Sequence, residues 1–286
     1  MVSIIVTCYN IENTIGYCLE SLLNQSYRDL DIILINDCST DNSLSVVQSY
    51  IEKDSRIRVI NNTTNLGPGI SRNIGLSYAK GDYVMVIDGD DIITPQFIEK
   101  LHDLAVTNNA DIVNGKMLLH DYKPSFDKQY VSIEEKVDYI KTEECTFINN
   151  KLIKRHLFDK VQYCNKRYAE DIIPYYKLIY YANKIVCDIN SQEYYEYVMR
   201  DTSLTHDRDI PKLRLLMSLS HIDLAYFLLS LNDKDIWMKA FNKFQLKNNV
   251  GDFLNPKKVN QEEYKSRYPK EYQELVTKWA ELKPLL

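Results

Sequence analysis

Residues 81–91 read GDYVMVIDGDD, and this stretch decides the fold. Its middle, Tyr83–Ile87, is a continuous apolar run, which is typical of a strand in a parallel sheet that is covered on both faces. The run ends abruptly in Asp88-Gly89-Asp90-Asp91. Carboxylates this close in sequence repel one another unless a positive group lies between them. Gly89 allows the backbone to turn sharply after the strand.

The position of these acids favours a ligand site. In open α/β sheets, ligands bind beyond the carboxyl ends of the strands. Clustered carboxylates at that edge suit a hard divalent cation that also holds substrate phosphates. The alternative is a solvated acidic turn that binds nothing, and the rest of the chain argues against it.

Composition and charge narrow the class of protein. The 286 residues are enough for one large domain with an appendage. A net charge of −5 argues against a nucleic-acid partner. The six cysteines form no CxxC pair, which predicts a reducing compartment. Met1 leads directly into a strand pattern and no long apolar run occurs, so we expect a cytoplasmic protein without a signal peptide or a spanning helix.

Strand and helix patterns alternate through the first 100 or so residues. The expected strands are Val2–Val6, Ile32–Ile35, Ile57–Ile60 and Tyr83–Ile87. Each is followed by a helical pattern with apolar residues on one face. This alternation predicts an α/β fold with a mostly parallel sheet flanked by helices on both faces. Polar side chains follow each strand, and the sheet should gather them on one rim.

A dinucleotide-binding fold is the first alternative. The Gly-x-Gly-x-x-Gly fingerprint is absent after the first strand, and Gly67-Pro68-Gly69 is followed by Arg72 where the third glycine would stand. No P-loop sequence occurs either. A nucleotide would therefore be held through a metal that bridges its diphosphate to carboxylates.

The end of the chain has a different pattern. After Pro211 the residues become helical, and an apolar stripe from Leu213 to Leu231 fits a helix that is buried on most sides. Lys and Arg exceed Asp and Glu in this part. We therefore predict an α/β domain at residues 1–206 and a helical extension at residues 207–286. The extension would contact a substrate, a partner or a membrane surface.

Six motifs resemble glycosyltransferase family 2, whose members have the GT-A fold. The motifs are VSIIVTCYN, LINDCSTDNS, NLGPGISRNIGL, GDYVMVIDGDD, NKLIKRHLF and AEDIIPYY, in the family's order over residues 1 to about 206. The resemblance implies an inverting enzyme that takes a sugar from a nucleotide diphosphate, usually UDP. The extension lies outside the resemblance.

The resemblance also implies roles for residues at the strand ends. Thr7, Tyr9 and Asp37 would hold the uracil and ribose, and Asn65 and Arg72 would reach the nucleotide. The Asp-x-Asp motif is Asp88-Gly89-Asp90, in which Asp88 contacts ribose and metal and Asp90 contacts the metal. Thr7 departs from the family, because many relatives have proline there.

Residues nearer the end of the catalytic domain complete the implied site. Asp171 of the Glu-Asp pair is the implied base, although an acid at a helix start can also be a simple N-cap. Arg200 would assist the leaving diphosphate. His206 could be a third metal contact, the alternative being an exposed histidine without a role.

These roles form a consistent reaction. A carboxylate takes the proton of an acceptor hydroxyl as the new bond forms. On the opposite face UDP leaves with its charge stabilised by a cation, for which Mn²⁺ or Mg²⁺ suits oxygen ligands. The base and the leaving group on opposite faces give inversion.

Two other functions are alternatives, a sugar-nucleotide nucleotidyltransferase and a non-catalytic module that binds a sugar nucleotide. A sugar-nucleotide nucleotidyltransferase should have a Gly-rich basic loop after the first strand, and residues 7–13 contain no Gly, Lys or Arg. A non-catalytic sugar-nucleotide-binding module should have lost some acidic positions, yet each is filled.

The resemblance further implies the acceptor, a growing surface glycan or a lipid-linked saccharide. Such an acceptor allows peripheral association with the inner face of the membrane. The helices of the extension would also allow copies of the chain to associate.

Overall fold

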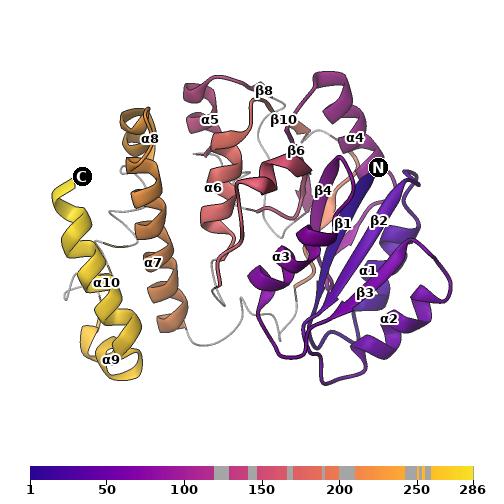
Figure 1. Ribbon diagram of the computed structural model, residues 1–286, viewed down its shortest axis with the longest axis horizontal. Coiled ribbons are helices and arrows are strands. Elements are labelled where there is room, and N and C mark those ends of the chain that lie inside the picture. The colour runs from indigo at the N-terminus through magenta and orange to yellow at the C-terminus, as the bar shows by residue number, and fades with distance from the viewer. Residues whose placement is uncertain are drawn as a thin grey trace. The chain divides into compact units, whose positions relative to one another are not determined.

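The computed structural model describes residues 1–118, 129–140, 147–165, 170–188, 191–199, 210–241, 250, 253–254 and 259–285 (Figure 1). The chain divides into two compact units, one of residues 1–165 and 177–199 and the other of residues 166–176 and 200–286. The predicted boundary after residue 206 falls outside the described residues. The assignment of residues 166–176 to the second unit was not predicted.

An eight-stranded sheet forms the centre of the first unit, in the order β3-β2-β1-β4-β9-β6-β10-β8. Its strands are β1 Val2–Cys8, β2 Leu30–Asn36, β3 Ile57–Asn61, β4 Tyr83–Asp88, β6 Ile112–Gly115, β8 Gln129–Tyr130, β9 Lys151–Lys154 and β10 Ile185–Asp188. The first four strands are parallel, with Val2 of β1 opposite Leu30 of β2 and Tyr83 of β4. Strand β9 runs antiparallel to both of its neighbours. The prediction of a mostly parallel sheet is confirmed.

The helices predicted after the first four strands are α1 Ile15–Leu23, α2 Ser43–Ile51, α3 Pro68–Tyr78 and α4 Phe97–Asn108. Later in the chain lies α6 Ile172–Tyr181, and the structure adds α5 Ile133–Ile140 and a 3₁₀ turn η2 at Arg155–Asp159, which were not predicted. Pro68 occupies the start of α3, where its missing N–H costs nothing. Gly67 before it has a φ of 84°, a conformation that favours glycine. Just before α2, the Asp41 carboxylate accepts a hydrogen bond of 2.9 Å from the backbone amide of Ser43, the first residue of the helix.

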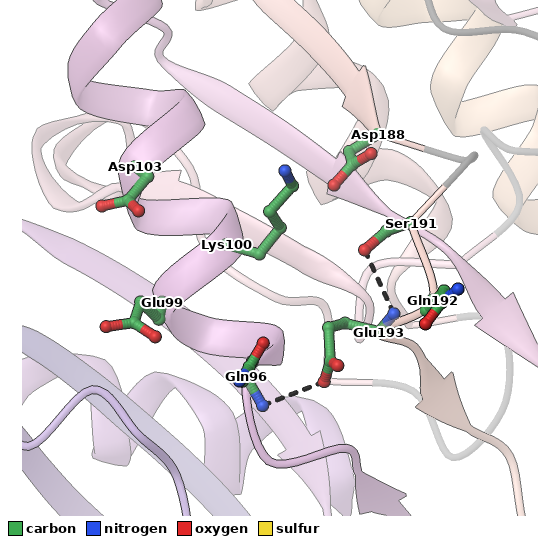
Figure 2. Close-up of a pocket in the computed structure, with 8 residues that line it drawn as sticks. All are labelled: Gln96, Glu99, Lys100, Asp103, Asp188, Ser191, Gln192 and Glu193. Carbon is green, nitrogen blue, oxygen red and sulfur yellow. Dashed lines mark hydrogen bonds between the residues drawn. The ribbon is translucent and has the colours of Figure 1, made fainter.

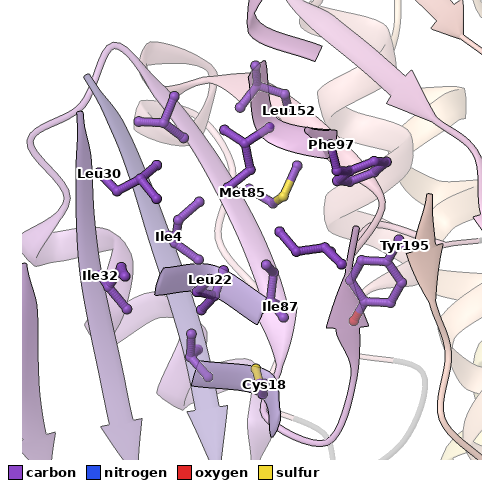
Figure 3. Close-up of a cluster of buried hydrophobic side chains, with 14 of the residues drawn as sticks. Ile4, Cys18, Leu22, Leu30, Ile32, Met85, Ile87, Phe97, Leu152 and Tyr195 are labelled. Carbon is purple, nitrogen blue, oxygen red and sulfur yellow. The ribbon is translucent and has the colours of Figure 1, made fainter. Parts of the chain in front are cut away.

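Alternate residues of β1 pack against helices on opposite faces of the sheet. Ile4 joins a buried apolar cluster with Cys18 and Leu22 of α1 (Figure 3). Ile5 faces α3, where a Cβ on Gly75 would come within 2.4 Å of its side chain. Gly75 therefore lets α3 lie close to the sheet, which fixes the helix that carries Arg72.

A second, three-stranded sheet in the order β5-β11-β7 was not predicted. Its strands are β5 Ile92–Ile93, β7 Met117–Leu118 and β11 Tyr195–Glu196. Tyr195 pairs with Ile93 in an antiparallel register. Since Ile92 directly follows Asp91, this sheet brings β11 beside the acidic turn.

Helices make up the described part of the second unit beyond residue 209. They are α7 Ile210–Leu229, α8 Lys234–Phe241, α9 Gln261–Arg267 and α10 Pro269–Leu282, followed by the 3₁₀ turn η5 Lys283–Leu285. Helices α7 and α10 are joined by an ion pair of 2.7 Å between Asp223 and Lys278. The expected helical character of this part of the chain is confirmed, and the bounds of the extension stay a prediction. Within the ranges that the structure describes, no helix combines the length and the apolar character needed to cross a bilayer.

Candidate active site

The acidic turn begins at the last residue of β4. Asp88 lies opposite Thr7 of β1 in the parallel register. The Gly89 amide donates to the Thr7 carbonyl at 3.0 Å. A Cβ on Gly89 would lie 2.7 Å from that carbonyl oxygen, so a side chain there would force the turn away from β1. The turn is thus held tightly against the end of the neighbouring strand.

Three side chains hold the Asp88 carboxylate. Arg72 Nη2 lies 2.9 Å and Thr7 Oγ1 lies 3.3 Å from Asp88 Oδ1. Asn149 Nδ2 donates to Asp88 Oδ2 at 2.7 Å. Burial alone would raise the pKa of Asp88, but the charge of Arg72 and these hydrogen bonds hold the pKa below its ordinary value. Asp88 is therefore ionised at neutral pH.

The surrounding protein also holds the Arg72 side chain in place. Only 5% of the residue is exposed, and its guanidinium lies 5.4 Å from the centroid of the Tyr163 ring. Asn73, the next residue of α3, exchanges two hydrogen bonds with the Tyr163 backbone, of 2.8 and 3.0 Å. The cation beside Asp88 is consequently held in one place by α3 and by the segment around Tyr163.

Asp91 lies in a different environment from Asp88, although only two residues separate them. Its side chain is buried and accepts the Tyr195 hydroxyl at 2.5 Å and the Val198 amide at 2.9 Å. Burial raises the pKa of Asp91 to about 8, and the charges of Asp88 and Asp90 add to that rise. The repulsion expected from the sequence is thus relieved by the charge of Arg72 at one end of the turn, and it contributes to the raised pKa of Asp91 at the other.

Asp37 organises the loop that precedes α3. Its carboxylate accepts three hydrogen bonds of 2.8 Å, from the Asn62 side chain and from the amides of Leu66 and Gly67. The sequence assigned Asp37 to the nucleotide, and the structure adds this second role. Asn65 is an exposed residue of the same loop.

The other predicted site residues fall into three groups. Tyr9 follows β1 at the same end of the sheet and is 45% exposed, and Asp90 is half-buried in the acidic turn. Asp171 belongs to the second unit, where its carbonyl accepts the Tyr175 amide at 2.9 Å in the first turn of α6. Arg200 and His206 lie outside the described residues. The structure therefore brings together Thr7, Arg72, Asp88, Gly89 and Asp90.

A family model described as glycosyl transferase family 2 matches residues 3–166. The chain belongs to this family. The resemblance read from its motifs is confirmed, as is the enzyme class, a glycosyltransferase.

Curated proteins named as glycosyltransferases resemble the chain over different lengths. "Glycosyltransferase GlyG" of Streptococcus pneumoniae is 31% identical over 202 residues, which are 65% of this chain and 67% of GlyG. Two further curated relatives are matched over 56% and 36% of their own length.

Among solved structures, S. aureus TarS 1-349 in complex with UDP-GlcNAc has a TM-score of 0.73 at 20% identity, covering 96% of this chain and 78% of that one. The mannosyltransferase PcManGT of Pyrobaculum calidifontis, in complex with GDP-Man and Mn²⁺, has a TM-score of 0.63 at 14% identity, covering 98% and 84%. These likenesses confirm the predicted GT-A fold.

Three contacts of this family 2 glycosyltransferase were not predicted from its sequence. Asn149 directly precedes the NKLIKRHLF motif, so its place beside a quoted motif was a usable signal. Tyr163 and Tyr195 offered none, because tyrosine is abundant in this chain, at 22 residues. A tyrosine whose hydroxyl holds a carboxylate cannot be told from one that only packs without knowing its neighbours.

A separate pocket of about 560 Å³ lies beside α4 (Figure 2). Gln96, Glu99, Lys100 and Asp103 line one wall, and residues 188 and 191–193 line the other. The backbone amide of Gln96 donates to Glu193 Oε2 at 2.9 Å and so connects the two walls. The described lining contains none of the predicted site residues. The acidic turn therefore remains the candidate active site of the family 2 enzyme.

Proposed function

We propose that the chain is an inverting glycosyltransferase that moves a sugar from a UDP-sugar to an acceptor hydroxyl with the help of a divalent cation. The ionised Asp88 carboxylate carries the proposal, because Arg72, Thr7 and Asn149 hold it at the carboxyl end of β4. This is the edge at which α/β sheets bind ligands. The UDP-GlcNAc of the TarS complex supports a uridine nucleotide.

The oxygen atoms of the acidic turn fit a cation that is shared with the substrate. In the part of the chain that the structure describes, no three His, Cys, Asp or Glu side chains gather into a metal site of their own. Mg²⁺ is usually held by one or two carboxylates together with substrate phosphates. Asp88 and Asp90 would be those carboxylates, with His206 as the proposed third contact. When bound, Mn²⁺ or Mg²⁺ would neutralise the charge that develops on the diphosphate.

The residues around the turn would bind and orient the nucleotide. Tyr9 and Asp37, with Thr7, are proposed to contact uracil and ribose, and Asn65 approaches from the loop that Asp37 holds. Arg72 and Arg200 are proposed to place positive charge near the diphosphate. Because Arg72 already pairs with Asp88, its guanidinium is oriented before the substrate arrives.

Asp171 is the proposed base. As the acceptor oxygen bonds to the anomeric carbon, the proton of the acceptor hydroxyl passes to the Asp171 carboxylate. The bond between the anomeric carbon and UDP breaks, and its electron pair leaves with UDP. Attack opposite the leaving group inverts the configuration at that carbon. The start of a helix favours an ionised carboxylate, which keeps the base ready to accept a proton.

A nucleotide-sugar panel tests the proposal. Purified full-length protein would be incubated with UDP-sugars and GDP-mannose, each with Mn²⁺, Mg²⁺ or EDTA, and assayed for released nucleoside diphosphate. We expect release from a UDP-sugar only with a cation. Release of pyrophosphate from a nucleoside triphosphate and a sugar phosphate would instead indicate a nucleotidyltransferase, and binding without any turnover would indicate a non-catalytic module.

The cation requirement has its own test in Asp90→Ala. We expect its calorimetric affinity for UDP with Mn²⁺ to fall at least about tenfold, because a direct ligand is lost. Asp235→Asn, an exposed acid at the start of α8, is the control and should bind UDP normally. Unchanged affinity in Asp90→Ala would remove Asp90 from the metal site.

We also propose a surface glycan or a lipid-linked saccharide as the acceptor, and a cytoplasmic enzyme that associates peripherally with the membrane through its helical extension. The surplus of Lys and Arg over Asp and Glu after residue 206 supports an anionic surface as the partner. Cosedimentation with phosphatidylglycerol vesicles, but not with phosphatidylcholine vesicles, is the expected result. Sedimentation velocity would show whether copies associate.

A further inference from the structure

Tyr195 connects the small sheet to the acidic turn. It is fully buried, and its ring packs among apolar side chains that include Phe97 and Ile87 (Figure 3). Its backbone is fixed on both sides, by pairing with Ile93 of β5 and with Met117 of β7. The position of the ring is therefore set by packing and by backbone pairing before the hydroxyl makes any contact.

The hydroxyl of Tyr195 uses its full hydrogen-bonding capacity at the turn. It donates to Asp91 Oδ2 at 2.5 Å and accepts from the Asp88 amide at 3.4 Å and from Asn149 Nδ2 at 3.3 Å. One donor and two acceptor positions are all that a hydroxyl offers. One oxygen atom thus contacts both ends of the turn and the amide that holds the Asp88 carboxylate.

Asp91 connects the acidic turn to the segment of Tyr195 through both of its carboxylate oxygens. Its other oxygen, Oδ1, accepts the Val198 amide at 2.9 Å. A single buried carboxylate therefore binds the acidic turn to residues 195–198, more than 100 positions later in the chain. Both ends of the connection are buried or half-buried, so water competes weakly for these hydrogen bonds.

We propose that Tyr195 is a positioning residue that sets Asp88 and Asp90 in the geometry that binds the cation and the nucleotide. This inference rests on the proposed function. Tyr195 would act through Asp91, Asp88 and Asn149 and would not touch the substrate. Outer contacts of this kind orient metal-binding carboxylates, and their loss typically lowers metal affinity or activity about 10- to 100-fold.

The aromatic ring and the hydroxyl have separable roles, which makes a test feasible. Phenylalanine keeps the ring in the apolar cluster and removes only the hydroxyl. Tyr195→Phe should therefore fold, and its defect should appear in cation use. Tyr130→Phe is the matched control, because Tyr130 is also buried but lies on the edge strand β8.

The experiment measures UDP binding by calorimetry across a series of Mn²⁺ concentrations, on full-length protein. We expect Tyr195→Phe to need about tenfold more Mn²⁺ for half-maximal UDP binding, and Tyr130→Phe to match the wild type. An unchanged Mn²⁺ requirement in Tyr195→Phe would overturn the inference. If the wild type bound no UDP at any Mn²⁺ concentration, the proposed function itself would fail.

Asp91→Asn provides a second route if Tyr195→Phe does not fold. An amide can accept only one of the two donors that the carboxylate accepts, so we expect a shift in the same direction. If both variants fold, their effects on the Mn²⁺ requirement should be less than multiplicative, because the two residues share one hydrogen bond. Independent, fully multiplicative effects, or no shift in Asp91→Asn, would contradict the proposed role.

Discussion

In the first half of the large sheet, β3-β2-β1-β4, all neighbouring strands are parallel, whereas β9, in the second half, is antiparallel to both of its neighbours. The first half uses strands that follow one another along the chain. The second half, β9-β6-β10-β8, collects short strands from residues 112–188. Both halves nevertheless hold the same carboxylate, Asp88, at the end of β4.

The two halves hold Asp88 by different means. From the first half come Thr7, at the end of β1, and the cation of Arg72, which α3 carries. Next to the second half, Asn149 precedes β9 and offers a neutral amide. The positive charge that pairs with Asp88, on Arg72, lies near Asp88 in the sequence. The position of Asn149, in contrast, depends on how strands that are distant in the sequence assemble.

The largest effect is expected outside both halves. Asp171→Asn should lower the turnover number about 10²- to 10⁴-fold, because the proposed base is lost, and should leave UDP affinity nearly unchanged. Initial rates with the preferred UDP-sugar and calorimetry with UDP measure the two quantities. Asp235→Asn, at another helix start in the second unit, should turn over normally. Near-normal turnover in Asp171→Asn would show that Asp171 is not the base and would leave it only the role of a helix N-cap.

A strong test of the first half is Arg72→Met. Removing the buried cation leaves the Asp88 carboxylate, whose side chain is 29% exposed, without its charge partner, and we expect the free energy of unfolding to fall by about 3 kcal/mol. Urea denaturation measures this change. Arg58→Met is the control, since the Arg58 side chain is 34% exposed against 6% for Arg72, and its pair with Asp31 should contribute about 1 kcal/mol or less. Equal losses in the two variants would contradict a special role for Arg72.

Asn149→Ala tests the contribution from the second half. The lost hydrogen bond ends on an ionised carboxylate, so the free energy of unfolding should fall by about 2 kcal/mol. The control is Asn108→Ala, whose amide donates to the neutral Leu104 carbonyl and should matter less. A larger loss in Asn149→Ala than in Arg72→Met would reverse the comparison between the two halves.

The smallest effect is expected for an ion pair and a hydrogen bond at Asp111, within the second half of the sheet. Asp111, just before β6, pairs with Lys154 of β9 at 2.9 Å and accepts the Asn183 amide at 2.6 Å. Burial alone would raise the pKa of Asp111, but these hydrogen bonds hold it below its ordinary value. Stability from this group is therefore present above about pH 4 and is lost as the pH falls through the lower, folded-state pKa.

Asp111→Asn should lower the free energy of unfolding by about 1.5 kcal/mol at pH 7, because hydrogen bonds that end on an ionised carboxylate are lost. As the pH falls from about 4 toward the folded-state pKa of Asp111, the difference from the wild type should shrink. Urea denaturation at pH 7 and at pH 3 measures both values. A difference that stays constant between the two pH values would show that the ionised form of Asp111 contributes nothing.

Prediction from sequence succeeded where the pattern is local. The buried runs of β1, β2 and β4 and the apolar faces of α1 and α4 repeat within 10 or so residues, so each element can be read by itself. Pro68 at the start of α3 is a further local signal, because proline suits the first turn of a helix. The two-residue strands β5, β7 and β11 are too short to show any period, and they were missed.

The sequence alone determined the parallel first half of the sheet, the family and the acidic turn, because each depends on residues that are neighbours or follow a short repeat. Only the tertiary structure decided that the pKa of Asp88 is lowered and that of Asp91 is raised. Asp88 and Asp91 differ because one meets Arg72 and the other is buried against Tyr195, a residue 104 positions away. Such environments arise only when distant strands pack, and a carboxylate responds to its surroundings in space, whatever its place in the chain.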